Sequence, residues 1–226
     1  MPRIIVFDVN ETLLDLSALD PHFERLFDDA LIRMQWFGQV LRSSLVATIT
    51  DTYHDFGVLA GDALDMMALR YGVDLSAEDR AGVLAGVRSL PPHEDIHDSL
   101  TRLKEAGLRL AALTNSPPHV LKEQLTNSGL INYFEQTLSV DATRKFKPAK
   151  EVYWHGAKSL GVSTAEMRMV AAHDWDIAGA MRAGCAGAFV ARPGMVMGPL
   201  QEKPDIIGPD MRSVADQIIE KESGKS

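Results

Sequence analysis

The 226-residue sequence holds one cysteine, Cys185, so it excludes an intramolecular disulfide and fits a reducing compartment. Its 23 basic residues are outnumbered by 31 acidic ones, which argues against nucleic acid or an anionic membrane as a partner. No apolar run approaches the roughly 20 residues of a membrane span, and the first residues resemble no secretory leader. We therefore expect a cytoplasmic protein whose partner is a small molecule.

Hydrophobic residues make up 46% of the chain and charged residues 24%, as in ordinary globular proteins. Four short apolar runs predict buried parallel strands at residues 4–7, 108–113, 167–171 and 188–190. Polar helical stretches at 96–106, 118–128, 149–160 and 176–184 alternate with the later runs. A weaker strand at 134–139, nearer an edge, and a final strand and helix at 205–207 and 211–219 complete the pattern. This alternation predicts an α/β fold with a parallel sheet.

Residues 15–90 interrupt this alternation. Helical periodicity runs through 20–34, 36–51, 58–71 and 77–88 with no strand between them, and Pro91 and Pro92 mark the return to the sheet. We predict an α/β core formed by residues 1–14 and 91–226, with a helical cap subdomain, residues 15–90, inserted after the first strand. Such a cap can close over the carboxyl end of that strand. The polar tail, 220–226, is expected to fray.

Polar side chains follow several predicted strands at the point where each strand ends. The carboxyl ends of parallel strands meet at one edge of a sheet, where α/β proteins place their chemistry. Each residue has a plainer interpretation alone: a turn aspartate, a helix cap, a surface lysine, a structural histidine or a core tyrosine. The set comprises Asp8, Thr114, Asn115, Lys147, Tyr153, His173 and Asp176. Together they predict an active site.

The chemistry of these residues is complementary. A lysine held near Asp8 keeps that carboxylate ionised at neutral pH. The helix predicted after Asn115 directs its N-terminal N–H groups toward the same edge and suits an anion. His173 titrates near neutrality and is a natural proton acceptor.

The motifs FDVNETLL, LTNS, FKP and AAHDWD together resemble those of the haloacid dehalogenase superfamily. The resemblance covers positions 8 to 176 and implies a Rossmann-like α/β core with a helical cap inserted after the first motif. It also implies that Asp8 is the nucleophile and Thr114 the second-motif hydroxyl. Lys147 is then the third-motif lysine and Asp176 the fourth-motif acid.

Two positions depart from the magnesium-dependent phosphotransferases of this superfamily. Those enzymes carry an acid two places after the nucleophile, where this chain has Asn10, and usually another at the place of Ala172. Magnesium needs several oxygen ligands, whereas a halide leaves without being protonated. The chain therefore resembles the (S)-2-haloacid dehalogenases of the superfamily, and we expect no metal and no other cofactor.

The same resemblance implies a substrate site made partly by the cap. Arg33 matches an arginine that holds the departing halide, while Phe37, Phe56 and Trp175 match an apolar pocket that excludes water. Asn10 can assist the leaving group, and Thr114 with backbone N–H groups near Asn115 can hold the substrate carboxylate. We expect Tyr153 to be a further substrate-binding residue. Taken alone, Arg33 reads as a surface charge and the aromatic residues as core.

Where many of these dehalogenases have serine and asparagine, this chain has Ala171 and His173. Glu11 lies three places after Asp8 in a predicted turn, so we hypothesise that it pairs with His173 to activate water. A carboxylate on one imidazole nitrogen fixes the tautomer and raises basicity at the other. Glu11 as a solvent-facing turn residue is the alternative, and the sequence leaves open whether His173 or Asp176 is the base.

The expected reaction is hydrolytic dehalogenation of short 2-haloalkanoic acids through an ester on Asp8, converting an L-2-haloacid to a D-2-hydroxyacid and halide. Defluorination of fluoroacetate, the preferred halogen, chain length and strictness of L selectivity stay open. The alternatives are a phosphatase of the same superfamily and a non-catalytic binding module. A homodimer is expected, with Trp36, Val40 and Leu41 placed either at its interface or inside the cap.

Overall fold

A computed structural model describes residues 2–222 and contains a six-stranded parallel sheet. The strand order is β3-β2-β1-β4-β5-β6, with β1 in the interior of the sheet. The strands are β1 (Ile4–Phe7), β2 (Leu110–Thr114), β3 (Gln136–Ser139), β4 (Met167–Ala171), β5 (Ala186–Val190) and β6 (Ile206–Gly208). The predicted α/β fold is confirmed, and the weakest predicted strand, β3, is an edge strand as expected.

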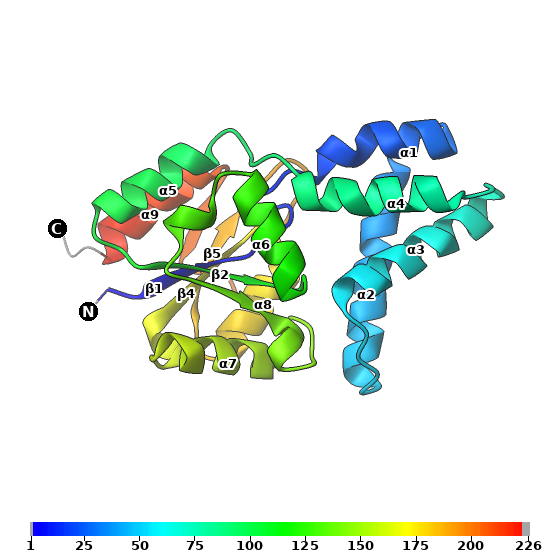
Figure 1. The fold of residues 1–226 in the computed structure, drawn as a ribbon. Helices are drawn as coiled ribbons and strands as arrows, with labels where there is room; N and C mark the ends of the chain where they lie inside the picture. Colours follow the sequence, from blue (N-terminus) through cyan, green and yellow to red (C-terminus); the bar gives the residue numbers. More distant parts are fainter. Residues whose placement is uncertain (1, 223–226) are drawn as a thin grey trace.

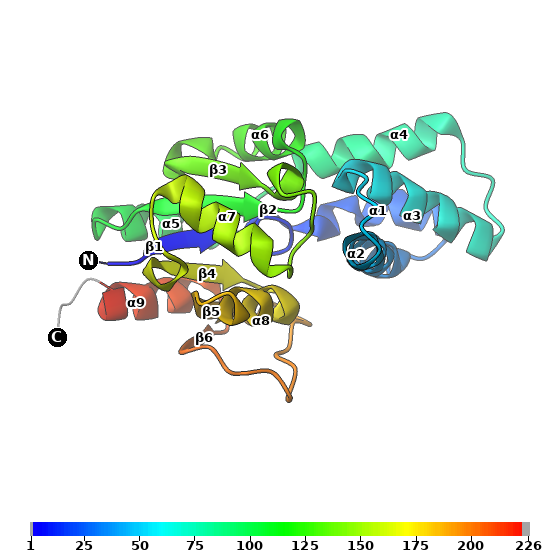
Figure 2. The same cartoon turned by 90° about the horizontal axis from the view of Figure 1, so that it is seen from below.

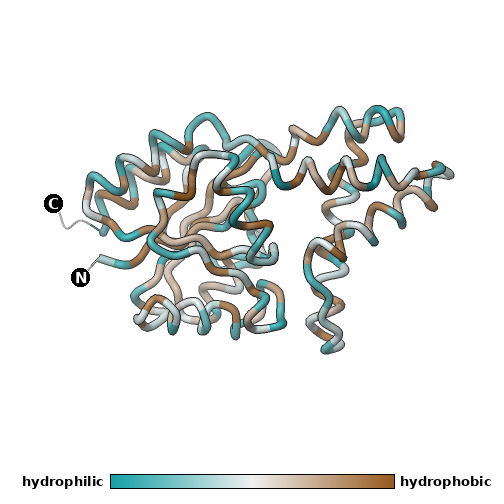
Figure 3. The backbone as a smooth tube through the Cα atoms, in the orientation of Figure 1, coloured by the Kyte–Doolittle hydropathy of each residue, from teal (hydrophilic) through white to brown (hydrophobic). Residues whose placement is uncertain are grey.

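Helices cover both faces of the sheet (Figures 1 and 2). One face carries α5 (Ile96–Glu105), α6 (Pro118–Asn127) and α9 (Met211–Glu222), and the other carries α7 (Lys150–Leu160) and α8 (Asp174–Arg182). The residues of β1, β2 and β4 are buried throughout, which fits the mostly apolar sequences of these strands, and Arg168 of β4 is the charged exception. Hydrophobic residues accordingly gather in the strands between the two layers of helices (Figure 3).

Four helices lie beyond the carboxyl end of β1, at one side of the sheet (Figure 1). They are α1 (Asp20–Phe27), α2 (Ile32–Ile49), α3 (Phe56–Tyr71) and α4 (Ala77–Gly86). Leu14 forms an isolated bridge with Pro92, so the chain leaves and re-enters the sheet region at adjacent points. The division into core and cap stays a prediction, but this helical stretch lies where the cap was expected.

Two predicted boundaries were wrong for local reasons. The expected helix at 20–34 is divided in two, because Asp28 adopts a left-handed conformation (φ 54°) that ends α1. Asp29 then accepts a hydrogen bond from the Leu31 N–H just before α2 begins. At the other site, α8 begins at Asp174 with His173 as its N-cap residue, two residues earlier than predicted, so Asp176 is not the N-cap.

The C-terminal helix is more firmly attached than its polar sequence indicated. Glu222 accepts a charged hydrogen bond from Arg168, a fully buried residue of β4, and another from Arg3. Arg168 also pairs with Asp205 (2.5 Å). The expected fraying is therefore wrong for residues 220–222, and residues 223–226 lie outside the described part. Among residues 2–222, no helix is long and apolar enough to cross a membrane.

Candidate active site

Asp8 lies at the carboxyl end of β1 and is almost fully buried. Its Oδ1 atom accepts a hydrogen bond from Lys147 Nζ at 2.8 Å. Its Oδ2 atom accepts one from Thr12 Oγ1 at 2.8 Å and lies 3.2 Å from His173 Nδ1. Burial by itself would raise the pKa of Asp8, but the charge of Lys147 and the contact with His173 hold it well below its usual range. Asp8 is therefore a buried carboxylate that stays ionised.

The Lys147 ammonium group lies between two carboxylates and is itself buried. Its Nζ atom donates to Asp8, to Asp176 Oδ2 at 2.6 Å and to the Leu113 carbonyl at 2.9 Å. Burial alone would lower the pKa of Lys147, but the charges of Asp176 and Asp8 raise it above its ordinary value. Three acceptors match the three N–H donors of an ammonium group, so the lysine is charged and fully occupied.

His173 bridges the carboxylates of the first motif. Its Nδ1 atom faces Asp8, and its Nε2 atom lies 2.9 Å from Glu11 Oε2. Burial would lower the pKa of His173, but hydrogen bonds to Asp8 and Glu11 raise it to about 9. With both ring nitrogens facing carboxylates, the imidazole is protonated at neutral pH and donates to each. The predicted Glu11–His173 pair is thus formed, but in this state His173 is an acid and not the expected base.

Glu11 reaches His173 because its backbone is left-handed (φ 61°), in a turn closed by a hydrogen bond from the Glu11 N–H to the Leu14 carbonyl. The Arg33 guanidinium lies 3.7 Å from Glu11 Oε1 and forms a closer ion pair with Asp20. Arg33 lines a cavity of about 280 Å³ together with Glu11, His93 and Arg192. Arg33 thus lies next to Glu11, in a cavity that does not include His173. Its halide-binding role stays a prediction.

The loop after β2 contributes the second motif. Thr114 and Asn115 are both buried, and their side-chain oxygens accept backbone hydrogen bonds. Thr114 Oγ1 accepts from the Ser116 N–H (3.2 Å), and Asn115 Oδ1 accepts from the Lys147 N–H (3.0 Å). Asn115 therefore ties the loop after β2 to the loop that carries the lysine. A substrate-carboxylate contact of these two residues stays a prediction.

Asn10 is oriented by a neighbour that sequence reasoning missed. Gln124 Nε2, on α6, donates to Asn10 Oδ1 at 2.9 Å and to the Val87 carbonyl at 2.9 Å. The Asn10 amide nitrogen is thereby turned toward Ser116 Oγ, 3.5 Å away. An amide held with its N–H₂ group outward is a donor, as a leaving halide requires, and it cannot replace the acid of a phosphotransferase.

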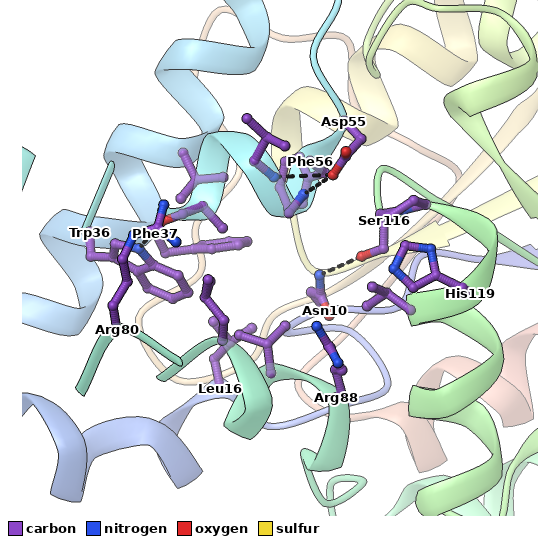
Figure 4. A pocket seen from close by; sticks show the side chains of 18 residues that line it. Asn10, Leu16, Trp36, Phe37, Asp55, Phe56, Arg80, Arg88, Ser116 and His119 are labelled. Carbon is purple, nitrogen blue, oxygen red and sulfur yellow. Dashed lines mark hydrogen bonds between the residues drawn. The ribbon is translucent and has the colours of Figure 1, made fainter. Parts of the chain in front are cut away.

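A cavity of about 330 Å³ opens beside Asn10, between α2, α3 and α4 on one side and α6 on the other (Figure 4). Phe37 and Phe56 line it, as the sequence predicted for an apolar pocket. The Phe37 ring also lies near the His173 ring, with centroids 6.1 Å apart. Both polar and apolar residues line the cavity: Asn10, Leu16, Trp36, Phe37, Val40, Asp55, Phe56, Gly57, Val58, Ala60, Arg80, Leu84, Val87, Arg88, Ser116, Pro117, His119 and Val120.

Two predicted substrate residues lie elsewhere. Tyr153 is fully buried, and its hydroxyl donates to Asp176 Oδ1 at 2.7 Å. The expected substrate contact of Tyr153 is therefore corrected: the phenol holds Asp176, which in turn holds Lys147. Trp175 stacks on His173 with ring centroids 4.9 Å apart, on the first turn of α8. It is not among the residues that line the 330 Å³ cavity.

Three further residues complete the site: Thr12, Ser116 and Gln124. Thr12 Oγ1 donates to Asp8 and accepts from the Ala172 N–H at 2.9 Å, so it joins the first motif to the fourth. Thr12 lies inside FDVNETLL and Ser116 inside LTNS, so the motifs themselves were a usable signal. Gln124 is an ordinary helix residue in the sequence, and only the packing of α6 against Asn10 reveals it.

The acids around Asp8 are not arranged as a metal site. Within residues 2–222, no group of three or more His, Cys, Asp or Glu side chains is positioned to hold a metal ion. Asp174 is directed away, since its Oδ2 atom accepts from the Gly198 N–H at 3.2 Å. The space between Asp8 and Asp176 is occupied by Lys147 Nζ. These residues therefore do not fit a resident cation.

The fold, the cap-like insertion and the four motifs define a class of hydrolase. Residues 2–184 match the family model described as haloacid dehalogenase-like hydrolase, and the chain belongs to that family. The family predicted from the motifs is therefore confirmed.

Characterised relatives are similar over nearly the whole chain. The (S)-2-haloacid dehalogenase of Pseudomonas sp. (strain YL) is 28% identical over 224 residues, covering 98% of this chain and 96% of the relative. The (S)-2-haloacid dehalogenase of Xanthobacter autotrophicus is 30% identical over 194 residues, covering 85% and 76%. The structure of L-2-haloacid dehalogenase from Xanthobacter autotrophicus with chloropropionic acid covalently bound superposes with a TM-score of 0.90 at 26% identity, covering 96% and 98%.

The raised pKa of His173 predicts a pH-dependent contribution to stability. Because the folded protein binds this proton more tightly than the unfolded chain, the contribution is complete below about pH 6.5 and is lost as the pH rises through about 9. It amounts to about 3 kcal/mol at most. Urea unfolding at pH 6 and pH 9.5 should show wild type losing this increment, while His173→Gln shows a much smaller change.

NMR titration of the imidazole tests the cause directly. Asp8→Asn removes one of the two carboxylates and should bring the His173 pKa down toward 6.5. Asp174→Asn is the matched control, because Asp174 bonds the Gly198 N–H instead of His173. A His173 pKa near 6.5 in the wild-type protein would contradict the bridging arrangement.

Proposed function

We propose that the protein is an (S)-2-haloacid dehalogenase, which hydrolyses 2-halocarboxylates to 2-hydroxycarboxylates and halide. The observation that carries the proposal is the buried, ionised Asp8 held by Lys147, with the amide of Asn10 in place of a second acid. The named relatives support this reaction, since the chain spans 96% of one of them. The reaction proceeds in two displacements, one at carbon and one at the Asp8 carboxyl group.

In the first displacement, Asp8 attacks C2 of the substrate from the face opposite the halogen. Within the described residues, Oδ1 accepts a single hydrogen bond, whereas Oδ2 is shared by Thr12 and His173. A carboxylate oxygen has two lone pairs, so Oδ1 keeps one for the attack. The C2–halogen bond breaks, an ester forms on Asp8, and inversion at C2 turns an L-substrate into a D-product.

The substrate is held by the loop after β2 and by the aromatic wall of the 330 Å³ cavity. Its carboxylate is bound by Thr114 and by backbone N–H groups near Asn115, and Phe37 and Phe56 exclude water. The Asn10 amide, aimed outward by Gln124, donates to the leaving halide. Arg33, which lies 3.7 Å from Glu11, and Trp175, which stacks on His173, receive the halide as it departs. Desolvation by the aromatic walls strengthens the nucleophile.

The second displacement becomes possible once Asp8 has lost its charge. Once Asp8 is an ester it carries no negative charge, so His173 keeps only Glu11 as an anionic partner and its pKa falls. The imidazole can then give up its Nδ1 proton and act as a general base on a water near the ester. Water attacks the Asp8 carboxyl carbon and gives one proton to His173. The ester C–O bond then breaks, and the 2-hydroxyacid leaves with the second water proton on its oxygen, which restores the Asp8 carboxylate and the protonated His173. Lys147 offsets the developing charge, and Asp176 holds Lys147 in place.

Isotope labelling tests the ester route. A single turnover of (S)-2-chloropropionate in ¹⁸O water, with EDTA present, should release halide and place the label in Asp8 instead of the first hydroxyacid formed. Mass spectrometry of the peptide that contains Asp8 measures this. Label found only in the product would contradict attack by Asp8, and phosphate release without halide release would favour a phosphatase.

Removing the water-activating base should separate the two steps. His173→Gln keeps a polar side chain of similar size but removes the base. We therefore expect about one equivalent of halide per active site, followed by a slow phase. A general base contributes roughly 10²–10⁴-fold, so turnover should fall by that factor. Intact-mass measurement should then show the trapped ester. Full steady-state turnover in His173→Gln would assign the base to another residue.

We also propose a homodimer in the cytoplasm. Trp36 and Val40 are buried inside the helical insertion, so they are not the interface that the sequence left possible. The exposed apolar residues of α2 are Met34 in its first turn and Leu45, Val46 and Ile49 near its end, the last 80% exposed. Apolar side chains exposed together, as the last three are, favour association. The single cysteine supports a reducing compartment.

A charge on this surface should separate the protomers. Light scattering should show a dimer for wild type and a monomer for Ile49→Lys, because a lysine is costly to bury between apolar faces. Arg42→Lys, on the same helix, is the matched control. A wild-type monomer at micromolar concentration would contradict the proposal.

A further inference from the structure

The 330 Å³ cavity begins at Asn10 and Ser116, next to the motifs that carry the catalytic residues, and is enclosed mainly by the helical insertion. Its upper wall is formed by apolar residues of three helices, among them Val40 on α2, Ala60 on α3 and Leu84 on α4. Val120 on α6 closes the side toward the sheet. Figure 4 shows Phe37 and Phe56, of the same helices, facing Asn10 across the open space.

Several polar side chains in the wall already have partners. The Trp36 indole donates to the Ala60 carbonyl (2.9 Å), and Asp55 caps α3 through the Gly57 and Val58 N–H groups. Arg80 pairs with Asp65 at 3.0 Å. The wall above Asn10 and Ser116 therefore presents mainly hydrocarbon surface to a ligand, whereas the floor presents an amide and a hydroxyl.

The cavity is larger than the smallest haloacids require. At about 30 Å³ per water-sized group, 330 Å³ has room for roughly eleven such groups. If each non-hydrogen atom takes the place of one such group, chloroacetate occupies about five of these places and 2-chloropropionate about six. Either one would leave about half of the chamber unfilled.

We propose that this chamber, bounded by Val40, Ala60, Leu84 and Val120, binds the C2 substituent, so that the preferred substrates are 2-haloacids with a larger apolar group on C2. An unbranched butyl chain or a phenyl ring has the matching size. This inference rests on the proposed function, because it places C2 beside Asp8. The substrate carboxylate and halogen stay at the polar floor while the hydrocarbon chain enters the cap.

A series of substrates with one halogen tests the inference. Each methylene buried in an apolar site favours binding by roughly fourfold. From (S)-2-bromopropionate to (S)-2-bromohexanoate, which adds three methylenes, kcat/KM should therefore rise between about tenfold and sixtyfold. Halide release measures every member of the series in the same way.

Filling the chamber should remove this preference selectively. Ala60→Leu adds hydrocarbon to the wall and should lower kcat/KM for 2-bromohexanoate by more than tenfold, with less than a threefold change for 2-bromopropionate. Val120→Phe fills the opposite side and should act in the same direction. Ala81→Leu is the matched control, since Ala81 is an exposed residue of α4 outside the cavity lining.

The outcomes separate the two proposals. No halide from any compound would overturn the proposed function itself. Halide from chloroacetate and 2-bromopropionate with kcat/KM flat or falling along the series would overturn only the chamber, and so would equal losses on short and long substrates in Ala60→Leu. If a filled variant fails to fold, the wild-type series alone decides the question.

Discussion

The structure of the site depends on one buried ammonium group. Lys147 Nζ joins Asp8, at the end of β1, to Asp176, on the first turn of α8, and to a carbonyl of β2. Two carboxylates this close could not both stay ionised in a buried site without it. The lysine therefore sets the protonation state of the nucleophile. Because its three donors are all occupied, it acts by charge and not by donating a proton to the substrate.

A second layer keeps this ion cluster in place. Tyr153 holds Asp176, Asn115 holds the backbone of Lys147, and Thr12 ties Asp8 to the Ala172 N–H. A buried charge is tolerated only when such hydrogen bonds satisfy it. The burial that makes the cluster costly also makes its electrostatic effect strong, since little water screens it. Polar residues around the cluster are thus needed for the reactivity of Asp8 as much as for folding.

His173 and the cavity have separate roles in the proposed reaction, which are proton transfer and the exclusion of water. Asp8 and Glu11 stabilise the protonated form of His173, so whether His173 acts as an acid or a base depends on the charge of Asp8. The residues of α2, α3 and α4 present hydrocarbon on the opposite side and leave Asn10 and Ser116 as a polar floor. In the proposed reaction, this separation provides an apolar chamber beside Asn10 that excludes water and, close to Asp8, a base for hydrolysis.

The order of strands and helices, and the meeting of Asp8, Lys147, His173 and Asp176, followed from the sequence, because apolar runs mark buried strands and parallel strands end at one edge. Glu11 and His173 were also paired correctly from their spacing. The sequence could not give the protonation of His173, the pairing of Arg33 with Asp20, the inward turn of Tyr153, or Gln124 as the partner of Asn10. Those properties depend on side chains from distant segments that share one buried volume, and only the packed tertiary structure determines which of them meet.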